Sequence, residues 1–226
     1  MKNLCIIPAR GGSKRIPRKN IRDFLGKPII AYSIEVALKS GLFEEVMVST
    51  DDKEIAEVAR KHGAKVPFMR SKKAADDFAT LADVVDEVLA GYKKEAVMFD
   101  YICCILPTAP LITLENLKKG LNLLAQSTAD SSKPLVRFSY PIQRAVRLLN
   151  GKTEMFYPEH KTTRSQDLEP AFHDAGQFYW MRFENGLRGE KKLGFEVSET
   201  EAQDIDTIDD WKLAEMKFKL QFEEPE

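Results

Sequence analysis

The segment from Pro8 to Arg22 carries residue types that could bind a phosphate chain. It contains six cations and no acid. Its glycine pair lets the backbone approach a ligand closely and point successive N–H groups at it. We therefore predict a triphosphate-binding loop. The residues assigned to nucleotide binding in this loop are Pro8, Ala9, Arg10, Gly11, Gly12, Ser13, Lys14, Lys19 and Asn20.

A basic loop can also be plain solvated surface. Here it follows a short apolar run, residues 4–7, typical of a strand buried on both faces. Proteins that alternate strands and helices bind ligands at the ends of such strands, so the position favours binding. The loop is not a Walker A motif, because no Gly-Lys-Ser/Thr closes it, and it lacks the GxGxxG pattern.

A second set of chemically capable residues lies near the end of the chain. Asp204 and Asp206 are two apart, so in an extended segment both carboxylates point to the same side. Mg²⁺ is bound well by one or two carboxylates together with phosphate oxygens. The alternative is that these acids only complement the N-terminus of a helix after Thr207. The basic loop in the same chain favours the metal site.

A nucleic-acid-binding module is the rival of another class, since basic runs often grip phosphates. The chain has 34 basic and 35 acidic residues and a net charge of −1. With no second basic patch, no overall field draws it toward nucleic acid or a membrane. The composition therefore favours a small-molecule ligand for the loop.

Alternating strands and helices must position these residues. We predict a doubly wound, mostly parallel sheet in a single α/β domain over residues 1–226. Strands are expected at residues 4–7, 46–49, 66–69, 101–106, 177–182 and 195–197. Helices are expected at 29–40, 54–61, 81–92, 114–126 and from Thr207 to about 222, with 70–80 as a polar loop.

The alternation breaks after residue 126. Residues 145–149 and 153–156 flank Asn150-Gly151, which predicts a hairpin with a type I′ turn. We expect residues 139–169 to form an arm for dimerisation; a plain excursion of the chain is the alternative.

The three cysteines, Cys5, Cys103 and Cys104, fall inside predicted strands. This indicates buried reduced thiols and not disulfides or a metal site. A strand is predicted to begin close to Met1, and no apolar run approaches membrane-spanning length. We expect a cytoplasmic protein without a signal peptide or membrane segment.

The run IPARGGSK at residues 7–14, with Pro17, Lys19 and Asn20, resembles the signature loop of the cytidylyltransferases that activate sialic-acid-type sugars. Later segments resemble the same family in the same order. They are Arg70 with Asp76, Asp77 and Thr80; the run PTAPL at 107–111, similar to the family's P-T-S-P-L; and DIDT at 204–207, similar to its metal-binding motif.

This resemblance implies a nucleotide-diphospho-sugar transferase-like fold and a homodimeric enzyme. It implies transfer of CMP from CTP to a nine-carbon nonulosonic acid, with pyrophosphate released and Mg²⁺ as cofactor. Asp204 and Asp206 are then the metal ligands. Arg10, Lys19 and Asp206 are the residues expected to carry catalysis. Arg70, Asp77 and Thr80 are expected to add contacts to the nucleotide.

The substrate is indicated by departures from the sialic acid synthetases. Leu106 and Ile112 replace a glutamine and an arginine that flank P-T-S-P-L there, and Ala175-Gly176 replaces Asn-Gly. Residues 172–180 instead resemble the pseudaminic acid cytidylyltransferases. Pseudaminate is less polar, which suits Leu106 and an aromatic, Phe178 or Trp180; N-acetylneuraminate, legionaminate and an octulosonate are alternatives. The residues expected to bind the sugar are Leu106, Thr108, Arg164, Gln166, His173, Gln177 and Tyr179, with a structural hydrogen-bonding role as the alternative for His173.

Overall fold

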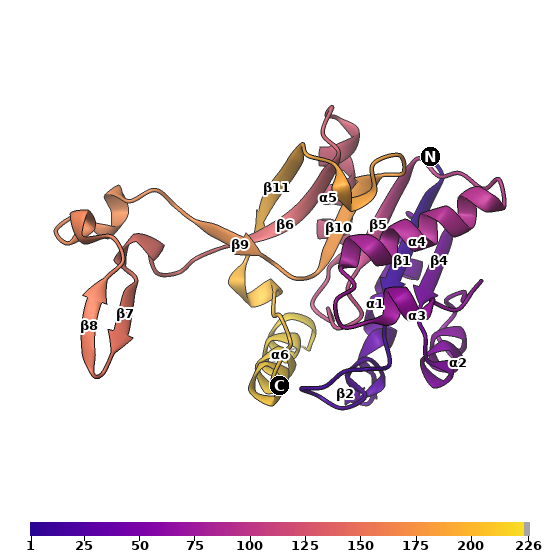
Figure 1. The fold of residues 1–226 in the computed structure, drawn as a ribbon, viewed down its shortest axis with the longest axis horizontal. Coiled ribbons are helices and arrows are strands. Elements are labelled where there is room, and N and C mark those ends of the chain that lie inside the picture. The colour runs from indigo at the N-terminus through magenta and orange to yellow at the C-terminus, as the bar shows by residue number, and fades with distance from the viewer. Residues whose placement is uncertain (224–226) are drawn as a thin grey trace.

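A seven-stranded sheet lies at the centre of the computed structural model, which describes residues 1–223 (Figure 1). β1 lies between β4 and β5 and is parallel to both, with Cys5 opposite Val46 and Cys103. Among the strands of this sheet, only β10 and the short β9 run opposite to the rest. The predicted mostly parallel sheet is confirmed. In spatial order the strands are β11 (Lys192–Val197), β6 (Ser131–Arg137), β10 (Phe178–Arg182), β5 (Tyr101–Ile105), β1 (Asn3–Pro8) and β4 (Glu45–Ser49), with β9 (Phe172–Asp174) beside β6.

Helices cover both faces of this sheet. Cys5 and Cys103 pack among residues of α1, α2 and α5, whereas Cys104 packs among residues of α4 on the opposite face. All three cysteines are buried and free. The two cores follow from the strand alternation, which sends neighbouring side chains to opposite faces. The helices are α1 (Ile29–Ser40), α2 (Lys53–Lys61), α3 (Lys72–Ala75), α4 (Leu81–Lys94), α5 (Leu114–Ala125) and α6 (Ile208–Phe222).

A third, smaller core fixes the basic loop to the last helix. Ile16 and Ile205 are fully buried against Phe24 and Trp211. The loop returns through two short strands, β2 (Asp23–Phe24) and β3 (Lys27–Pro28), before α1 begins. This apolar contact holds the predicted phosphate loop beside the predicted metal-binding segment, although the two are far apart in the sequence.

One predicted strand is wrong, and one strand of the sheet was not predicted. Residues 66–69 are not a strand: Lys65 makes one isolated bridge to Met47, and Pro67 then has no N–H to continue the ladder. The strand β6 was not predicted, because its serines and Pro134 lack the apolar pattern of a central strand. The carbonyl of Pro134 still accepts a hydrogen bond from the Ala175 N–H at 3.2 Å. The polar loop at 70–80 also contains the short helix α3.

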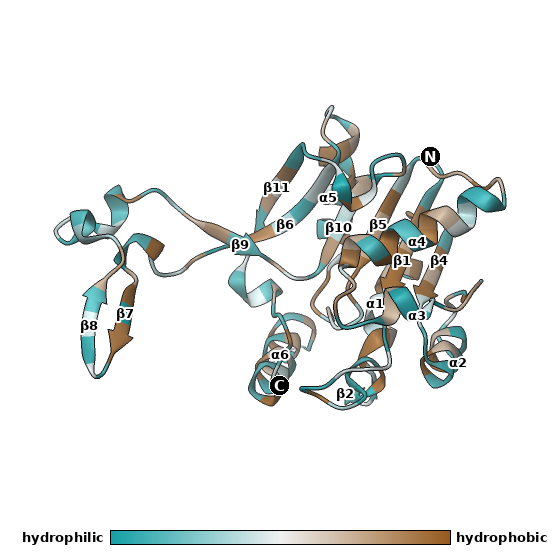
Figure 2. Cartoon of the chain, viewed as in Figure 1, coloured by the Kyte–Doolittle hydropathy of each residue, from teal (hydrophilic) through white to brown (hydrophobic). Residues whose placement is uncertain are grey.

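An arm projects from the sheet between β6 and β9 (Figure 1). It carries the hairpin of β7 (Val146–Leu149) and β8 (Lys152–Met155), whose turn residues Asn150 and Gly151 both have positive φ, as a type I′ turn requires. The predicted hairpin is confirmed. Three of the four residues of β7, Val146, Leu148 and Leu149, are apolar and solvent-exposed within this chain (Figure 2).

Candidate active site

Three segments meet around a cavity of about 240 Å³ at the carboxyl ends of β1 and β5. They are the basic loop after β1, the turn after β5 and the segment that precedes α6. The edge of a parallel sheet where strands end is where such folds bind ligands. The cavity is lined by Pro8, Arg10, Ser13, Lys14, Arg15, Ile16, Lys19, Asn20, Leu106, Pro107, Thr108 and Asp204.

Two of the loop cations anchor the loop and do not line the cavity. Arg18 donates to Asp52 and to Glu54, each at 2.5 Å. Its guanidinium lowers the pKa of the Asp52 carboxyl, which also caps α2. Arg22 lies over the Trp211 ring at 5.5 Å. These two residues therefore hold the loop to α2 and to α6.

The glycine pair serves two purposes. A Cβ on Gly11 would lie 2.7 Å from the Asp52 carboxylate, so only glycine lets the loop pass this close to α2. The Gly11 N–H donates to Asp51 at 3.0 Å. A Cβ on Gly12 would meet nothing within 4 Å. Gly11 is thus required for packing against α2, and the open face of the loop lies at Gly12.

Buried polar contacts set the shape of the ligand-facing part of the loop. Asn20 is buried, and its side-chain amide donates to the Arg10 carbonyl at 2.9 Å. The Lys19 ammonium donates to the Ile205 carbonyl at 2.6 Å, which links the loop to the acidic segment. Ala9 is buried in the core and does not line the cavity. Its N–H donates to the carbonyl of Ser49 in β4.

The acid pair lies beside these cations. Asp206 is 2.7 Å from the Arg15 guanidinium and 3.6 Å from the Lys19 ammonium. Asp204 lines the cavity and keeps an exposed side chain. Burial raises the pKa of the Asp204 carboxyl, and the nearby Asp206 carboxylate raises it further. Two mutually repelling carboxylates at this place have the character of a cation site.

These acids fit the requirements of Mg²⁺. Among residues 1–223 no three His, Cys, Asp or Glu side chains form a group that could hold a metal ion. Mg²⁺ does not need one, because it usually takes one or two carboxylates and fills its remaining positions with water and phosphate oxygens. Asp204 and Asp206 are the residues that would hold it.

Asp77 lies among the cations expected to bind phosphate. Its carboxylate accepts from Arg10 at 3.1 Å and from Lys14 at 2.5 Å. These contacts lower the pKa of the Asp77 carboxyl, chiefly through the hydrogen bond from Lys14. An ionised carboxylate only accepts hydrogen bonds, so Asp77 is not suited to bind a phosphate oxygen directly. In this structure its side chain holds two cations of the loop, and its assignment as a nucleotide ligand stays a prediction.

Two more predicted nucleotide ligands have structural partners. Arg70 is buried and donates to the hydroxyl and the carbonyl of Ser49, at 3.0 and 2.6 Å. Burial lowers the pKa of its guanidinium. Thr80 is the N-cap of α4 and forms a capping box with Asp83. Neither lines the cavity described above.

The residues of β10 divide between two faces. Phe178 and Trp180 are fully buried, and the Trp180 indole donates to the Leu117 carbonyl of α5. The prediction that either ring contacts the sugar is therefore wrong, because strand alternation turns both into the core. Tyr179 points the other way and donates to Asp174 at 3.2 Å, and burial followed by that carboxylate raises its pKa.

Gln177 connects the turn after β5 to the segment before α6. Its carbonyl accepts from the Leu106 N–H at 2.8 Å, and its side-chain amide donates to the Glu201 carbonyl at 2.5 Å. Gly176, next to it, has positive φ and would place a Cβ 3.5 Å from Asp204. Gln177 thus positions Leu106 at the cavity, where Thr108 also lies.

The remaining predicted sugar ligands lie outside this cavity. His173 in β9 holds its Nδ1 2.9 Å from the Asp174 carbonyl and packs on Phe138. Arg164 is exposed on the arm and pairs with Asp167. Gln166 lines a separate cavity of about 490 Å³ at the base of the arm.

Sequence reasoning did not assign Arg15, Ile16 or Pro107 to the site. Arg15 was counted among the cations, but its partner Asp206 is known only from the fold. Ile16 could have been predicted as an anchor of the loop, because it is an apolar residue inside a basic segment. Pro107 follows β5 directly and lines the cavity beside Leu106.

The sequence matches the family model described as cytidylyltransferase over residues 4–212. It is 46% identical to the pseudaminic acid cytidylyltransferase of Campylobacter jejuni subsp. jejuni serotype O:2, with 99% of each chain covered. It is 32% identical to the CMP-N,N'-diacetyllegionaminic acid synthase of Legionella pneumophila, with 97% of each covered. A solved CMP:2-keto-3-deoxy-manno-octonic acid synthetase complexed with CTP has a similar fold, with a TM-score of 0.71 at 19% identity over 98% of this chain and 100% of that one.

Proposed function

The chain belongs to the cytidylyltransferase family, and on that premise we propose that it transfers CMP from CTP to pseudaminic acid and releases pyrophosphate. The observation that carries this proposal is the cavity at the carboxyl ends of β1 and β5. It brings a cation-rich loop, an apolar wall and one acid of the pair, Asp204, to one place. A polyphosphate, a sugar of low polarity and a divalent cation require these three surfaces.

The basic loop would bind the triphosphate and stabilise the departing pyrophosphate. Arg10, Ser13, Lys14 and Lys19 all line the cavity, and Asn20 fixes the Arg10 backbone. In the reaction a hydroxyl oxygen of the acceptor forms a bond to the α-phosphorus as the bond to pyrophosphate breaks. Such transfers depend on positioning and on charge stabilisation, without a covalent nucleophile on the protein.

The acid pair would lie where the two anionic substrates, the nucleotide and the sugar acid, meet. Mg²⁺ bound there would supply positive charge between the nucleotide phosphate and the sugar acid. Asp204 and Asp206 would hold it, with Lys19 keeping their segment against the basic loop through the Ile205 carbonyl. The apolar side chain of Leu106 and the hydroxyl of Thr108 would face the sugar from the opposite wall.

The arm at 139–169 would form the contact between two copies of the chain. It carries exposed apolar side chains, among them Leu148, which is 70% exposed, together with Val146 and Phe156. Isolated arms of this kind gain stability when their apolar side is covered. Arg164 and Gln166, which are predicted to bind the sugar, lie on this arm.

No helix among the described residues is long and apolar enough to cross a membrane. The three buried free cysteines support the proposal that the enzyme is cytoplasmic, because thiols stay reduced in the cytoplasm.

One assay tests the proposed function. Pyrophosphate release from CTP is measured with pseudaminate, N-acetylneuraminate, legionaminate and an octulosonate, each with Mg²⁺. We expect the highest kcat/KM with pseudaminate. A higher value with another sugar acid would reassign the substrate within the family. No release with any of them would favour a phosphate-binding module without catalysis.

A further inference from the structure

The carboxylate of Asp77 lies between two cations that are expected to bind phosphate. Arg10 donates to one of its oxygens at 3.1 Å and Lys14 to the other at 2.5 Å. Both cations also line the candidate active site. An anion supplied by the chain itself thus occupies groups that are expected to bind an anionic ligand.

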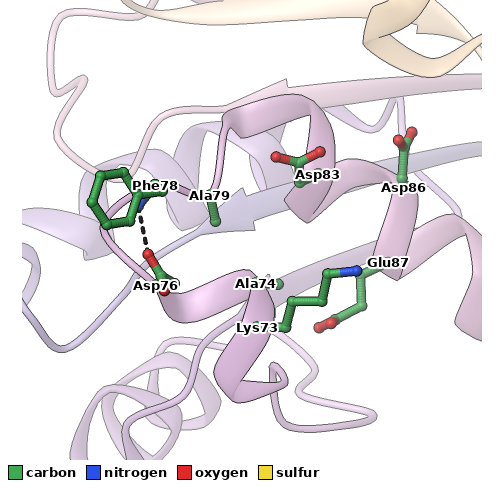
Figure 3. A pocket seen from close by; sticks show the side chains of 8 residues that line it. All are labelled: Lys73, Ala74, Asp76, Phe78, Ala79, Asp83, Asp86 and Glu87. Carbon is green, nitrogen blue, oxygen red and sulfur yellow. Dashed lines mark hydrogen bonds between the residues drawn. The ribbon is translucent and has the colours of Figure 1, made fainter.

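Asp77 lies in a tight turn between α3 and α4 that presents it to the cations. The preceding acid, Asp76, accepts a hydrogen bond from the Phe78 N–H at 2.7 Å, and Figure 3 shows this bond inside the turn. Thr80 then caps α4. Phe78 is 92% exposed, so little packing holds the turn in place. The turn is therefore held by hydrogen bonds to Asp76 and by the cap of α4, with little packing from the Phe78 side chain.

The contact differs from the anchoring ion pair in the same loop. The side chain of Asp52, held by Arg18, is 21% exposed and also caps α2 through the Ile55 N–H. The side chain of Asp77 is 47% exposed. Exposed ion pairs contribute little to stability, so a polyphosphate can displace Asp77 at small cost. Displacing Asp52 would also uncap a helix.

We propose that Asp77 is an internal competitor of the polyphosphate: it holds Arg10 and Lys14 when the site is empty, yields to CTP, and returns to speed the release of pyrophosphate. This inference rests on the proposed function, in which Arg10 and Lys14 bind the phosphates of CTP. It concerns affinity for the phosphate chain and adds no step to the reaction. A ligand that lacks the β- and γ-phosphates does not compete with Asp77.

The test compares two variants that each remove one negative charge from the same turn. In Asp77→Asn the competing anion is lost. In Asp76→Asn the carboxylate bonded to the Phe78 N–H is lost, whereas the contacts of Asp77 remain. Binding of inorganic pyrophosphate and of CMP is measured by calorimetry for both variants and for the unaltered protein.

We expect Asp77→Asn to bind pyrophosphate about tenfold more tightly than the unaltered protein, in line with the loss of two exposed ion pairs. Its affinity for CMP should not change, and pyrophosphate should inhibit its turnover more strongly. Asp76→Asn should resemble the unaltered protein in all three respects. Equal pyrophosphate affinity in the two variants, or weaker binding by Asp77→Asn, would overturn the inference and make Asp77 a positioning residue for the cations. Turnover of the unaltered protein with the sugar acids reports separately on the proposed function.

Discussion

The backbone N–H of Asp206 donates a hydrogen bond to the carboxylate of Asp210 at 3.1 Å, so two acids four residues apart share one turn. Asp210 also accepts from the N–H and the hydroxyl of Thr207, each at 2.8 Å, and completes the capping box of α6. The Asp206 carboxylate turns instead to Arg15. Asp210 therefore caps the helix, and the Asp206 carboxylate faces the cations of the basic loop.

Replacing Asp206 by Asn should abolish Mg²⁺-dependent turnover while the protein stays folded. The substitution keeps the shape of the side chain and removes one of the two charges expected to hold the ion. Turnover is measured against Mg²⁺ concentration, with thermal unfolding as the check on folding. Asp210→Asn is the matched control. It should lose at most about 1 kcal/mol of stability and little activity. Full activity of Asp206→Asn, or activity in excess chelator, would contradict the proposed metal site.

Replacing Arg10 by Ala should lower kcat about 10²-fold, as expected when one donor to the developing charge is lost. The measurement is steady-state release of pyrophosphate. Arg188→Ala is the control. Arg188 forms ion pairs with Asp83 and Asp86, and its replacement should leave the activity unchanged. If kcat is unchanged while KM for CTP rises, Arg10 contributes only to ground-state binding.

Replacing Leu106 by Gln should shift substrate preference away from pseudaminate. Leu106 lines the cavity, and its backbone is fixed by hydrogen bonds with Gln177 and with the Ser33 hydroxyl, so the change is confined to the side chain. We expect the ratio of kcat/KM for pseudaminate over N-acetylneuraminate to fall about tenfold. An unchanged ratio would show that Leu106 does not face the sugar.

Replacing Leu148 by Asp should weaken the proposed dimer about tenfold or more, because it places a charge in the apolar contact. Molar mass is measured by light scattering over a range of concentrations. Leu220→Asp makes the same chemical change at an exposed position of α6 and should leave the mass unaltered. A monomeric unaltered protein would contradict the proposed role of the arm.

The cap of α4 should give a pH-dependent contribution to stability. Hydrogen bonds from Thr80 and then from Arg188 lower the pKa of Asp83 from 3.8 to about 2. Because the folded-state pKa is depressed, the contribution is complete above the unfolded pKa and is lost as pH falls through the folded pKa. Asp83→Asn should therefore melt at a lower temperature than the unaltered protein at pH 6, and the difference should shrink between pH 4 and pH 2.

Local pattern was enough to predict most of the elements. Helix α1 begins and ends at the predicted residues, because Pro28 precedes it and Gly41, with positive φ, follows it. The hairpin at Asn150-Gly151 was predicted for the same kind of reason: its turn chemistry is local. The strand β6 was not predicted, since its position is set by its neighbours β10 and β11 and not by its own hydrophobicity.

The sequence by itself determined which residues could bind phosphate and metal, because charge and residue spacing are local properties. Only the tertiary structure decided how those residues are used. It turned Arg18 to Asp52 as an anchor, set Asp77 on Arg10 and Lys14, and directed Phe178 into the core. The paired residues are separated by dozens of positions in the sequence, and the direction of Phe178 depends on which face of its strand it occupies. Their proximity depends on how the strands pair and how the helices pack, which spacing along the chain does not contain.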